Sequence, residues 1–399
     1  MSVDVIADCG HTTPSRRRFC SVTEARPVRT SRAERITNLD TVRGIATLGI
    51  LLMNIVYFGL DEAAYFNLDA DGSDSVLDWI VGGFGEVFVD QKMMAIFSLL
   101  FGAGIVLFAD RAEAKGGRPV ALSLWRNLLL LGIGVLHGLL YEGDVLQVYA
   151  VCAPVLLLLR KRSPRTLGVV GVLLVVSSAL IGFAVAPTIS SAGEELGDFW
   201  FAGGDEMSDG VGLWLLWDFG ARSLGLMLIG VAMFRTGIVQ GTGPEATDAR
   251  MIRWGFGLGL PLAVAALVVV VATDFDPQFA IPGHALNTLA TIPMALGYIG
   301  AITRWNRRTD TMLHERFRAV GRMALTNYLT QSILGIAIAT FLVPDGSGRF
   351  VLLLVVLVIW AAQFAWSKPW LERFTMGPAE WIWRVATYRR LSPIRRATP

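Results

Sequence analysis

The sequence predicts an all-α fold: a polytopic membrane helix bundle of about ten transmembrane helices with both chain ends in the cytoplasm. Hydrophobic residues make up 53% of the 399 residues and charged residues only 17%, whereas soluble domains carry roughly 25% charged residues. The apolar residues form blocks of about 20, long enough to cross a bilayer as helices that satisfy their own backbone hydrogen bonds. Lys and Arg gather in alternate connecting segments, as they do in cytoplasmic loops.

The chain divides into four parts on these criteria. An arm that is polar and basic, without the apolar core of a signal peptide, is predicted to be disordered and cytoplasmic. A membrane domain follows, made of an N-terminal six-helix part and a C-terminal four-helix part, and a basic cytoplasmic tail closes the chain. The boundaries are 1–35 for the arm, 36–240 and 241–372 for the two parts of the membrane domain, and 373–399 for the tail.

Most spans follow from single apolar blocks, but the segment 76–109 needs two elements. It is too long for one span and is interrupted by Asp90 and Lys92. We therefore expect an interfacial helix near 76–91, followed by a span at 93–109. The other spans are predicted at 41–60, 121–141, 145–159, 166–187, 219–239, 254–273, 284–303, 323–343 and 350–367.

The orientation follows from the positions of the basic residues. Basic segments precede the first span and follow the second, fourth, eighth and tenth, while acidic loops without a base follow the first and fifth. Counted in this way, every basic segment lies on one side of the membrane and both acidic loops lie on the other. If 76–91 also crossed the membrane, every later loop would change sides. Because cytoplasmic loops are enriched in Lys and Arg, we expect a multi-pass protein of the bacterial cytoplasmic membrane with both termini inside.

Several kinds of site are not predicted. The formal net charge of +2 is too small to indicate nucleic-acid binding. Cys9, Cys20 and Cys152 show no metal-ligand spacing. The sequence has no cluster of His, Cys and carboxylate residues and no glycine-rich phosphate loop, so neither a metal site nor a nucleotide cofactor is predicted. The partners that we expect are the lipid bilayer and a small-molecule or lipid-linked substrate.

The first span carries a polar stripe. Asp40, Arg43, Thr47 and Asn54 fall on one helix face at 100° per residue, although an ionisable residue inside a span costs a few kcal/mol on insertion scales. One interpretation is structural: Arg43 reaches lipid phosphates and Asn54 bonds a neighbouring helix. The other interpretation makes Asp40 and Arg43 substrate-binding residues and places Asn54 in a catalytic site.

The third span begins with Arg126 and ends in a polar cluster near the predicted outer boundary. His137 and Tyr141 lie one turn apart, and Glu142 and Asp144 follow. A histidine beside carboxylates is a candidate general base, because the pKa of imidazole lies near neutrality and a carboxylate orients the ring. The alternative interpretation is a capped helix end with a hydrogen-bonded histidine.

Further candidate substrate-binding residues form two groups. One group, on the predicted outer side, can ring an outward-facing polar cavity, although its i,i+4 pair in the sixth span also fits a simple helix ion pair. The other group, near the cytoplasmic end of the ninth span, suits either helix packing or a cytoplasmic ligand. The outer group comprises Lys92, Asp218, Arg222, His284 and Asn287, and the ninth-span group comprises Thr326, Asn327, Tyr328 and Gln331.

Five segments of the chain carry a family resemblance. They are RITNLDTVRGIATLGILLMNI, KMMAIFSLLFGAGIVL, RNLLLLGIGVLHGLLYEGDVLQVYA, GRMALTNYLTQSILG and RFTMGPAEWIWRVATYRR. In this order they resemble the YeiB-like bacterial membrane proteins, grouped as domain of unknown function 418, over nearly all of residues 35–390. The resemblance implies a largely uncharacterised membrane protein, loosely described as transport-associated.

A more distant resemblance is confined to the early spans. The segment LDTVRGIATLGILLMN looks like the first helix of transmembrane acyltransferases, in which an arginine is followed eleven residues later by histidine or asparagine. Arg43 and Asn54 match the branch that resembles heparan glucosaminide N-acetyltransferases. In the sugar O-acyltransferase branch this position is a histidine linked to catalysis. Asn54 cannot act as a general base, so we expect it to donate to a carbonyl. The resemblance implies acyl-CoA as a co-substrate.

Two main functions therefore compete. In the first, acyl-CoA docks at the cytoplasmic face near Arg43 and Arg126, and the acyl group passes to an extracytoplasmic or lipid-linked acceptor. His137 is then the base, oriented by Glu142 or Asp144. The difficulty is geometric, because His137 is expected toward the outer side of the membrane and Arg43 toward the inner side.

The second function is transport or flipping of a small or lipid-linked molecule. Charged groups at membrane level and the glycine-rich FGAG of the second span fit a moving bundle as well as a catalytic one. Because the sequence has no ATP-binding motif, an ion gradient or a partner would have to drive it. A third function, as a non-catalytic membrane partner of another protein, also stays open.

Overall fold

The computed structural model describes residues 37–396, which form one compact unit. The regular secondary structure of these residues is helical, apart from an isolated β-bridge between Phe374 and Arg395. The all-α prediction is confirmed for the part of the chain that the structure covers. The arm predicted at 1–35 lies outside the described residues.

Nine segments of the described chain are helices long and apolar enough to cross a membrane, so this is a multi-pass membrane protein. They are α1 (Thr37–Gly59), the consecutive α2 (Val76–Phe84), η2 (Gly85–Val89) and α3 (Lys92–Ala114), α4 (Pro119–Gly138), α6 (Pro164–Val185) with η3 (Ala186–Thr188), α7 (Asp209–Arg235), α8 (Glu245–Ala272), η5 (Pro277–Phe279) with α9 (Ala280–Arg308), α11 (Ala324–Leu342) and α12 (Arg349–Arg373). The remaining helices are η1 (Glu62–Tyr65), α5 (Val145–Leu159), η4 (Gly197–Phe199), α10 (Met312–Arg322) and α13 (Pro378–Tyr388).

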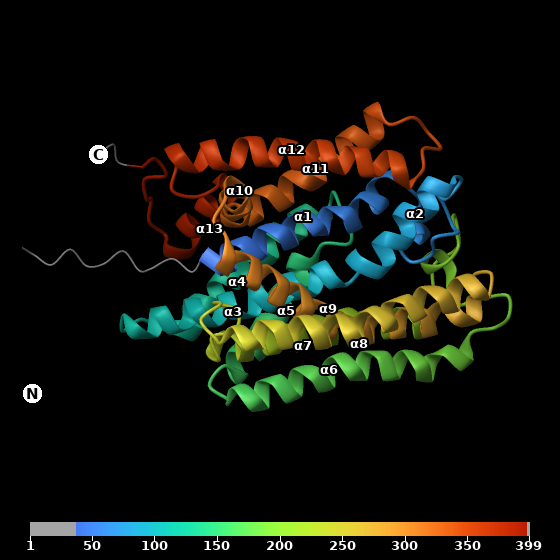
Figure 1. The fold of residues 1–399 in the computed structure, drawn as a ribbon, viewed down its shortest axis with the longest axis horizontal. Helices are drawn as coiled ribbons and strands as arrows, with labels where there is room; N and C mark the ends of the chain where they lie inside the picture. The colour runs from blue at the N-terminus through green and yellow to red at the C-terminus, as the bar shows by residue number, and fades with distance from the viewer. Residues whose placement is uncertain (1–36, 397–399) are drawn as a thin grey trace, which may run out of the picture. The chain divides into compact units, whose positions relative to one another are not determined.

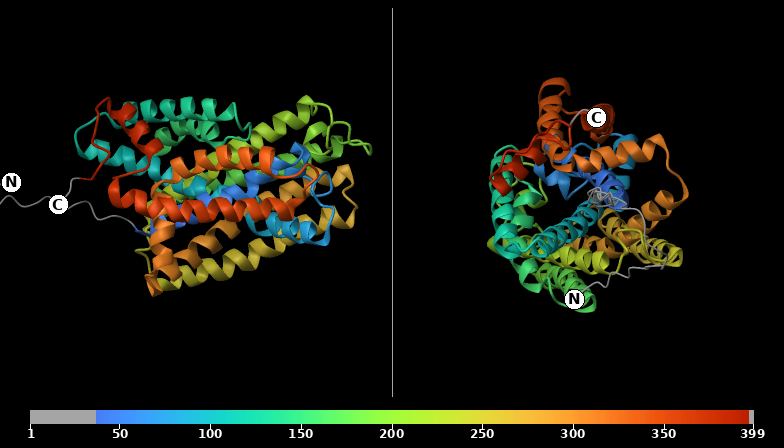
Figure 2. Two further views of the ribbon diagram at one scale, coloured as in Figure 1. Left: turned by 90° about the horizontal axis from the view of Figure 1, so that it is seen from above. Right: turned by 90° about the vertical axis from the view of Figure 1, so that its left-hand side faces the viewer.

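α1 lies in the middle of the helices that position the candidate site (Figure 1). α6, α7, α8 and α9 pack together on one side of it, and α10, α11 and α12 pack on the other. Figure 2 shows the same helices from above and from one end. The backbones of α3 and α7 are in contact where the two helices cross. A Cβ on Gly102 would lie only 2.2 Å from the carbonyl oxygen of Met227. Small residues permit such close crossings in membranes.

The two ends of the bundle differ in charge. One end, which we call the basic end, carries α10, α13 and the loops that connect α3 to α4, α5 to α6 and α7 to α8. The other end, the acidic end, carries η1 and η4. Basic-end residues include Arg118, Arg162, Arg308 and Arg373, and acidic-end residues include Glu62, Asp198, Asp205 and Glu206.

α5 is the apolar helix that completes the predicted ten, and it is short. Its 15 residues span about 22 Å at 1.5 Å per residue, less than the roughly 30 Å of a hydrocarbon core. Leu136, Leu139 and Leu140, where α4 turns toward α5, are more than half exposed. The turn between α4 and α5 therefore has an apolar surface.

The second span is broken in its interior. Asp90 and Gln91 separate η2 from α3, and Gln91 has a φ of 58°, in the left-handed region that non-glycine residues rarely adopt. The break lies deep in the bundle, because Met93 packs against Gly49 in the middle of α1. η2 packs against both α1 and α8. The segment η2 therefore enters the bundle, whereas α2 keeps Val76, Leu77, Ile80 and Phe84 more than half exposed. The interfacial position of a helix near 76–91 stays a prediction.

The basic tail beyond α12 contains a folded helix, α13. The Trp383 indole donates to the carbonyl of Arg126 in α4 (2.9 Å). The Glu380 carboxylate accepts from the backbone N–H groups of Leu325 (2.8 Å) and Thr326 (3.2 Å). The first N–H groups of a helix need such acceptors, because they have no partner within the helix. α13 therefore ties the middle of α4 to the start of α11.

Candidate functional site

A buried histidine site lies between α4 and α11. His137 Nδ1 lies 2.9 Å from Asp144 Oδ1, and His137 Nε2 lies 2.9 Å from Ser332 Oγ. The Tyr328 hydroxyl donates to the same Asp144 oxygen (2.9 Å). His137 and Asp144 are 4% exposed and Ser332 is 1% exposed, so water competes little for these bonds. We refer to these four residues as the histidine centre.

Local helix chemistry explains how this centre forms. Asp144 is the N-cap of α5, where its Oδ2 accepts the backbone N–H of Gln147 (3.2 Å), a common role for aspartate. A Cβ on Gly134 would lie 2.7 Å from Asp144 Oδ2, so only glycine lets the cap fold so closely against α4. Tyr328 and Ser332 are four residues apart on α11 and therefore share one helix face.

Of the other two predicted catalytic residues, Asn54 is linked to the histidine centre and Glu142 is not. Asn54 connects to it through Tyr141, whose hydroxyl donates to Asn54 Oδ1 (3.0 Å) and whose ring packs edge-on to His137 with centroids 6.1 Å apart. Glu142 is exposed at the turn between α4 and α5. The carboxylate that orients His137 is therefore that of Asp144, and Glu142 is not its partner.

The histidine centre is buried inside the bundle. His137 follows Pro119, the first residue of α4, by 18 residues, about 27 Å along the helix, so it lies near the end of α4 that is far from the basic end. Ser332 follows Ala324, the first residue of α11, by about 12 Å on the same scale. The sequence could not show the burial of this centre, because it depends on the packing of α4 against α11.

The predicted basic-end arginines have different surroundings. The Arg43 side chain is 31% exposed, with Nη1 3.4 Å from Asp40 Oδ1. The Arg126 guanidinium lies over the rings of Trp383 and Phe108, 3.6 Å and 4.8 Å from their centroids. Arg43 thus remains open to a surface ligand, whereas Arg126 packs between aromatic rings as a cation–π partner.

Asn327, another predicted substrate-binding residue, joins helices. Its Nδ2 donates to the carbonyl of Val320 and to Ser367 Oγ, both at 3.2 Å, and its Oδ1 accepts the Trp366 indole (3.0 Å). The residue is 0% exposed. Because both amide donors and the amide oxygen have partners, the structure favours the packing interpretation for Asn327.

A second polar cluster surrounds the break between η2 and α3. Lys92 Nζ donates to the carbonyl of Glu86 (2.7 Å) and to Asn287 Oδ1, and Asn287 Nδ2 donates to Asp90 Oδ2 (2.7 Å). Lys92 is 0% exposed. A buried ammonium is stable only when it is paired and hydrogen-bonded, and the carbonyl freed by the helix break supplies one of its acceptors.

An ion pair on α7 completes this cluster, which we call the break centre. Arg222 Nη2 lies 2.8 Å from Asp218 Oδ2, and His284 Nε2 lies 3.2 Å from the same oxygen. Ser178 Oγ donates to Asp218 Oδ1. The Arg222 side chain is 1% exposed, yet its Nε and Nη1 have no hydrogen-bond partner among the described residues. Because buried polar groups are normally paired, these donors are available to an oxygen atom of a ligand.

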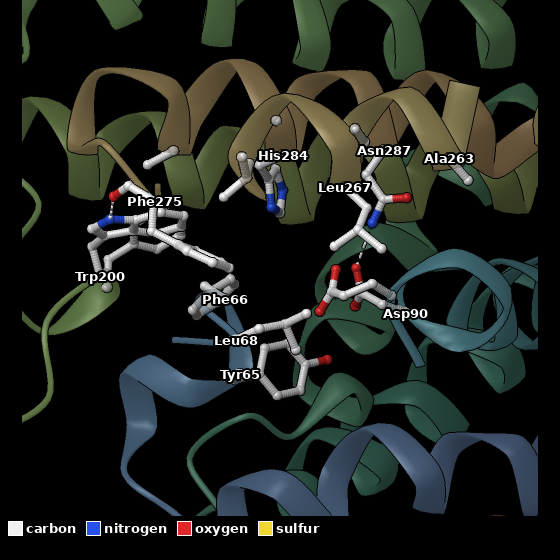
Figure 3. A pocket seen from close by; sticks show the side chains of 16 residues that line it. Tyr65, Phe66, Leu68, Asp90, Trp200, Ala263, Leu267, Phe275, His284 and Asn287 are labelled. Carbon is white, nitrogen blue, oxygen red and sulfur yellow. Dashed lines mark hydrogen bonds between the residues drawn. The ribbon is translucent and has the colours of Figure 1, made fainter. Parts of the chain in front are cut away.

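A small cavity that is partly open to its surroundings lies beside the break centre (Figure 3). A still smaller cavity shares part of its lining and reaches Arg222 and Met53, the neighbour of Asn54 in α1. The larger cavity is lined by the aromatic residues Tyr65, Phe66, Phe199, Trp200 and Phe275 and by the polar residues Glu86, Asp90, His284 and Asn287.

Tyr65 lines both cavities. Burial is the largest cause that raises the pKa of its phenol well above 10.0, and Tyr141 and Asp90 raise it further. The smaller cavity is lined by Met53, Asp90 and Arg222 and by none of the four residues of the histidine centre.

Metal ligands do not gather in the part of the chain that the structure describes, where His, Cys, Asp and Glu form no group of three or more that fits an ion. Cys152 is a buried free thiol, and Cys9 and Cys20 lie outside the described residues. The polar groups of both centres bond one another directly, so each is a hydrogen-bond network.

Comparisons with known proteins place the chain in a family. Residues 233–390 match the family described as "Protein of unknown function (DUF418)". The chain is 32% identical over 393 residues to "Uncharacterized protein YeiB" of Escherichia coli (strain K12), an alignment that covers 90% of this chain and 98% of that protein. The chain belongs to the DUF418 family. It is also 28% identical over 407 residues to "Uncharacterized protein YxaH" of Bacillus subtilis (strain 168), covering 92% and 97%.

The segment matched to DUF418 contributes to both centres. It contains Tyr328 and Ser332 of the histidine centre and His284 of the break centre, whereas His137 and Asp144 come from the earlier helices. The names of both relatives state that they are uncharacterised. The activity of this DUF418 protein therefore has to be argued from the geometry of its own residues.

Sequence reasoning missed some of the polar residues that the structure brings together. Ser332 was not singled out, although its spacing of four from Tyr328 placed both on one face of α11. Gln91, whose Oε1 accepts from Thr288 Oγ1 (3.1 Å), gave no signal of its left-handed backbone. Ser178, the partner of Asp218, lies in a mostly apolar helix. A polar residue in such a helix indicates a polar partner on a neighbouring helix, so the sequence did carry a signal for this contact.

Proposed function

We propose that this DUF418 protein transfers an acyl group from cytoplasmic acyl-CoA to an extracytoplasmic or lipid-linked acceptor. The single observation that supports this proposal is the hydrogen-bonded series Ser332–His137–Asp144, buried inside the bundle. A hydroxyl, an imidazole and a carboxylate in this order perform acyl transfer on several unrelated folds. The proposal includes the location inferred from the charge pattern: the bacterial cytoplasmic membrane, with the basic end on the cytoplasmic side.

The base in this proposal is His137. With Asp144 accepting the proton of Nδ1, the neutral ring presents the lone pair of Nε2. The Tyr328 hydroxyl and the Gln147 N–H also donate to Asp144, so the carboxylate is held in place by three donors. A ring oriented in this way can take a proton from an attacking hydroxyl or amine and return it to a leaving group.

The donor side of the proposed reaction is the basic end. Ser332 lies about 12 Å along α11 and His137 about 27 Å along α4 from the starts of these helices, so in this proposal the acyl thioester has to reach deep into the bundle. Arg43, which remains partly exposed, can pair with a phosphate of the donor.

The acceptor side is the cavity of Figure 3. Its aromatic walls and its polar groups at Asp90, His284 and Asn287 suit a ligand with both apolar and hydrogen-bonding faces. The smaller cavity reaches Met53 in α1. An acceptor that enters from the acidic end would approach His137 along this side of α1.

The test is release of free coenzyme A from purified protein in nanodiscs. With acetyl-CoA or longer acyl-CoAs, wild-type protein should release coenzyme A, and Asp144→Asn and His137→Gln should each lower the rate by about 100- to 10,000-fold, the usual contribution of acid–base catalysis. Glu142→Gln should leave the rate unchanged, because Glu142 is exposed at the turn. The absence of release with every donor, together with no thermal stabilisation by any of them, would contradict the proposal.

The break centre favours a second candidate function, transport. A discontinuous helix with buried, paired ionisable groups is the arrangement in which many secondary transporters bind their substrate and coupling ion. Here the break at Asp90 and Gln91 lies beside Lys92, Asp218 and Arg222. A transporter built on this centre would move a small solute through the cavity and release it chemically unchanged.

Proteoliposomes distinguish the two functions. Vesicles incubated with a bacterial metabolite extract under an imposed pH gradient would be washed and analysed by mass spectrometry. A solute that accumulates unchanged inside wild-type vesicles, and does not accumulate with Arg222→Met, would establish transport. A solute that is recovered only in acylated form would support acyl transfer instead.

A further inference from the structure

We propose that Ser332 takes up the acyl group itself, so that the reaction passes through an acyl-serine intermediate within the membrane. This inference rests on the proposed acyl transfer and deepens it. The histidine centre would then act as a covalent two-step catalyst, with acyl-CoA as the donor of the first step and a hydroxyl or amine as the acceptor of the second.

The first argument is that the one lone pair of His137 is already engaged. When Nδ1 donates its proton to Asp144, Nε2 is the only acceptor on a neutral imidazole, and the atom that faces it is Ser332 Oγ at 2.9 Å. The hydroxyl of Ser332 therefore donates to His137. The proton that this histidine is placed to remove is the proton of Ser332.

The second argument concerns Asp144. Its Oδ1 accepts the Tyr328 hydroxyl (2.9 Å) and lies 2.9 Å from His137 Nδ1, and its Oδ2 accepts the Gln147 N–H (3.2 Å). Because an ionised carboxylate can only accept hydrogen bonds, His137 Nδ1, which faces Asp144, has to carry a proton and donate it. The opposite tautomer, with its proton on Nε2, would place two acceptors face to face at 2.9 Å.

The third argument is that Ser332 bonds a histidine ring nitrogen, whereas several other hydroxyls of the described spans donate to a backbone carbonyl. Buried Ser and Thr residues in helices usually donate to a carbonyl one turn earlier. Ser98 donates to the carbonyl of Met94 (2.8 Å), and Thr330 donates to the carbonyl of Asn327 (3.0 Å). Ser332 instead points across the helix interface at His137, which is the arrangement of an activated nucleophile.

The chemistry balances without a further reactant. Ser332 Oγ attacks the thioester carbonyl and forms an ester bond, while His137 takes the serine proton and gives it to the departing thiolate as the carbon–sulfur bond breaks. In the second step the acceptor oxygen or nitrogen attacks this ester, and His137 takes the acceptor proton. The carbon–Oγ bond then breaks and the proton returns to Ser332, so the enzyme is regenerated.

The experiment is to trap the intermediate in full-length protein in nanodiscs with radiolabelled acetyl-CoA and no acceptor. After an acid quench, peptide mass spectrometry should find one acetyl group on the peptide that contains residue 332. Ser332→Ala should lose the label and slow coenzyme A release at least about 100-fold. Thr330→Ala, a neighbouring hydroxyl outside the histidine centre, should keep both. All variants carry Cys152→Ala, so that the buried thiol cannot take the label.

A second variant tests the same intermediate independently if Ser332→Ala folds poorly. Ser332→Cys should form a thioester that neutral hydroxylamine releases at once, whereas the wild-type ester resists it. Coenzyme A release that depends on His137 but leaves no acetyl group on residue 332 would overturn the acyl-serine and leave acyl transfer standing. No coenzyme A release with any donor would overturn both.

Discussion

Single carboxylates determine the structure of both centres, and Asp218 shows the principle most clearly. It is 1% exposed and accepts from four side chains: Arg222, His284, Ser178 and Thr288. In a low-dielectric interior the attraction between Asp218 and Arg222 offsets the cost of removing both charges from water only while both are present. The structure at this point therefore depends on the pair and not on either residue alone.

Removing one member of this pair should cost more than removing both. Asp218→Ala leaves the Arg222 guanidinium buried without a counter-charge, and we expect a loss of about 3–5 kcal/mol in the free energy of unfolding. The double change Asp218→Leu with Arg222→Met should recover most of that loss. Denaturant titration of the purified variants in mixed micelles measures both values. Equal losses for the single and the double variant would show that the pair is not coupled.

Glu380 gives a prediction about pH. Burial raises the pKa of this carboxyl above its ordinary value of 4.5. Between 4.5 and the raised folded pKa, the folded protein holds a proton that the unfolded chain has released, so the free energy of unfolding falls as the pH rises across that window. Thermal unfolding measured from pH 4 to 8 should show this slope. Glu380→Gln should flatten it, and an unchanged slope would assign it to another group.

At the scale of the helices, the crossing of α3 and α7 explains why the second span contains two glycines with different roles. A Cβ on Gly102 would lie 2.2 Å from the Met227 carbonyl oxygen, whereas nothing lies within 4 Å of a Cβ on Gly104. We expect Gly102→Ala to destabilise the bundle by about 1–3 kcal/mol through overpacking. Gly104→Ala should be neutral or slightly stabilising, because alanine favours the helix. Thermal unfolding of the two variants compares them directly.

The helices themselves were largely predictable, because apolar blocks of about 20 residues and the parity of basic loops need no tertiary information. The break at Asp90 and Gln91 was visible as an interruption, but its depth was not. That depth depends on the packing of η2 against α1 and α8. The helices α4 and α5 were predicted at 121–141 and 145–159, close to the bounds that the structure gives them.

The sites were predictable in kind and less so in arrangement. Spacing placed His137 near Asp144 and put Asp218 one turn from Arg222, because those pairs are local in sequence. Ser332 reaches His137 across 195 residues of chain, a contact that a single sequence does not reveal. The same holds for Lys92 and Asn287, which meet only because the broken span lies against α9.

The two centres lie in a bundle with unlike ends. Ser332 lies about 12 Å along α11 from its start, next to α10 of the basic end, and the cavity beside the break centre borders η1 and η4 of the acidic end. This order fits a donor that enters from one side of the membrane and an acceptor that enters from the other, provided that the basic end faces the cytoplasm.

That orientation has a direct test. Ala202, in the loop before α7, and Ala246, near the start of α8, are exposed at opposite ends of the bundle. In chains whose native Cys9, Cys20 and Cys152 are replaced, Ala202→Cys should react with a membrane-impermeant maleimide in intact spheroplasts. Ala246→Cys should react only after lysis, because cytoplasmic loops carry the Lys and Arg residues. The reverse pattern would place the basic end outside, and acyl-CoA, which is confined to the cytoplasm, would then meet the aromatic cavity of the break centre before the histidine centre.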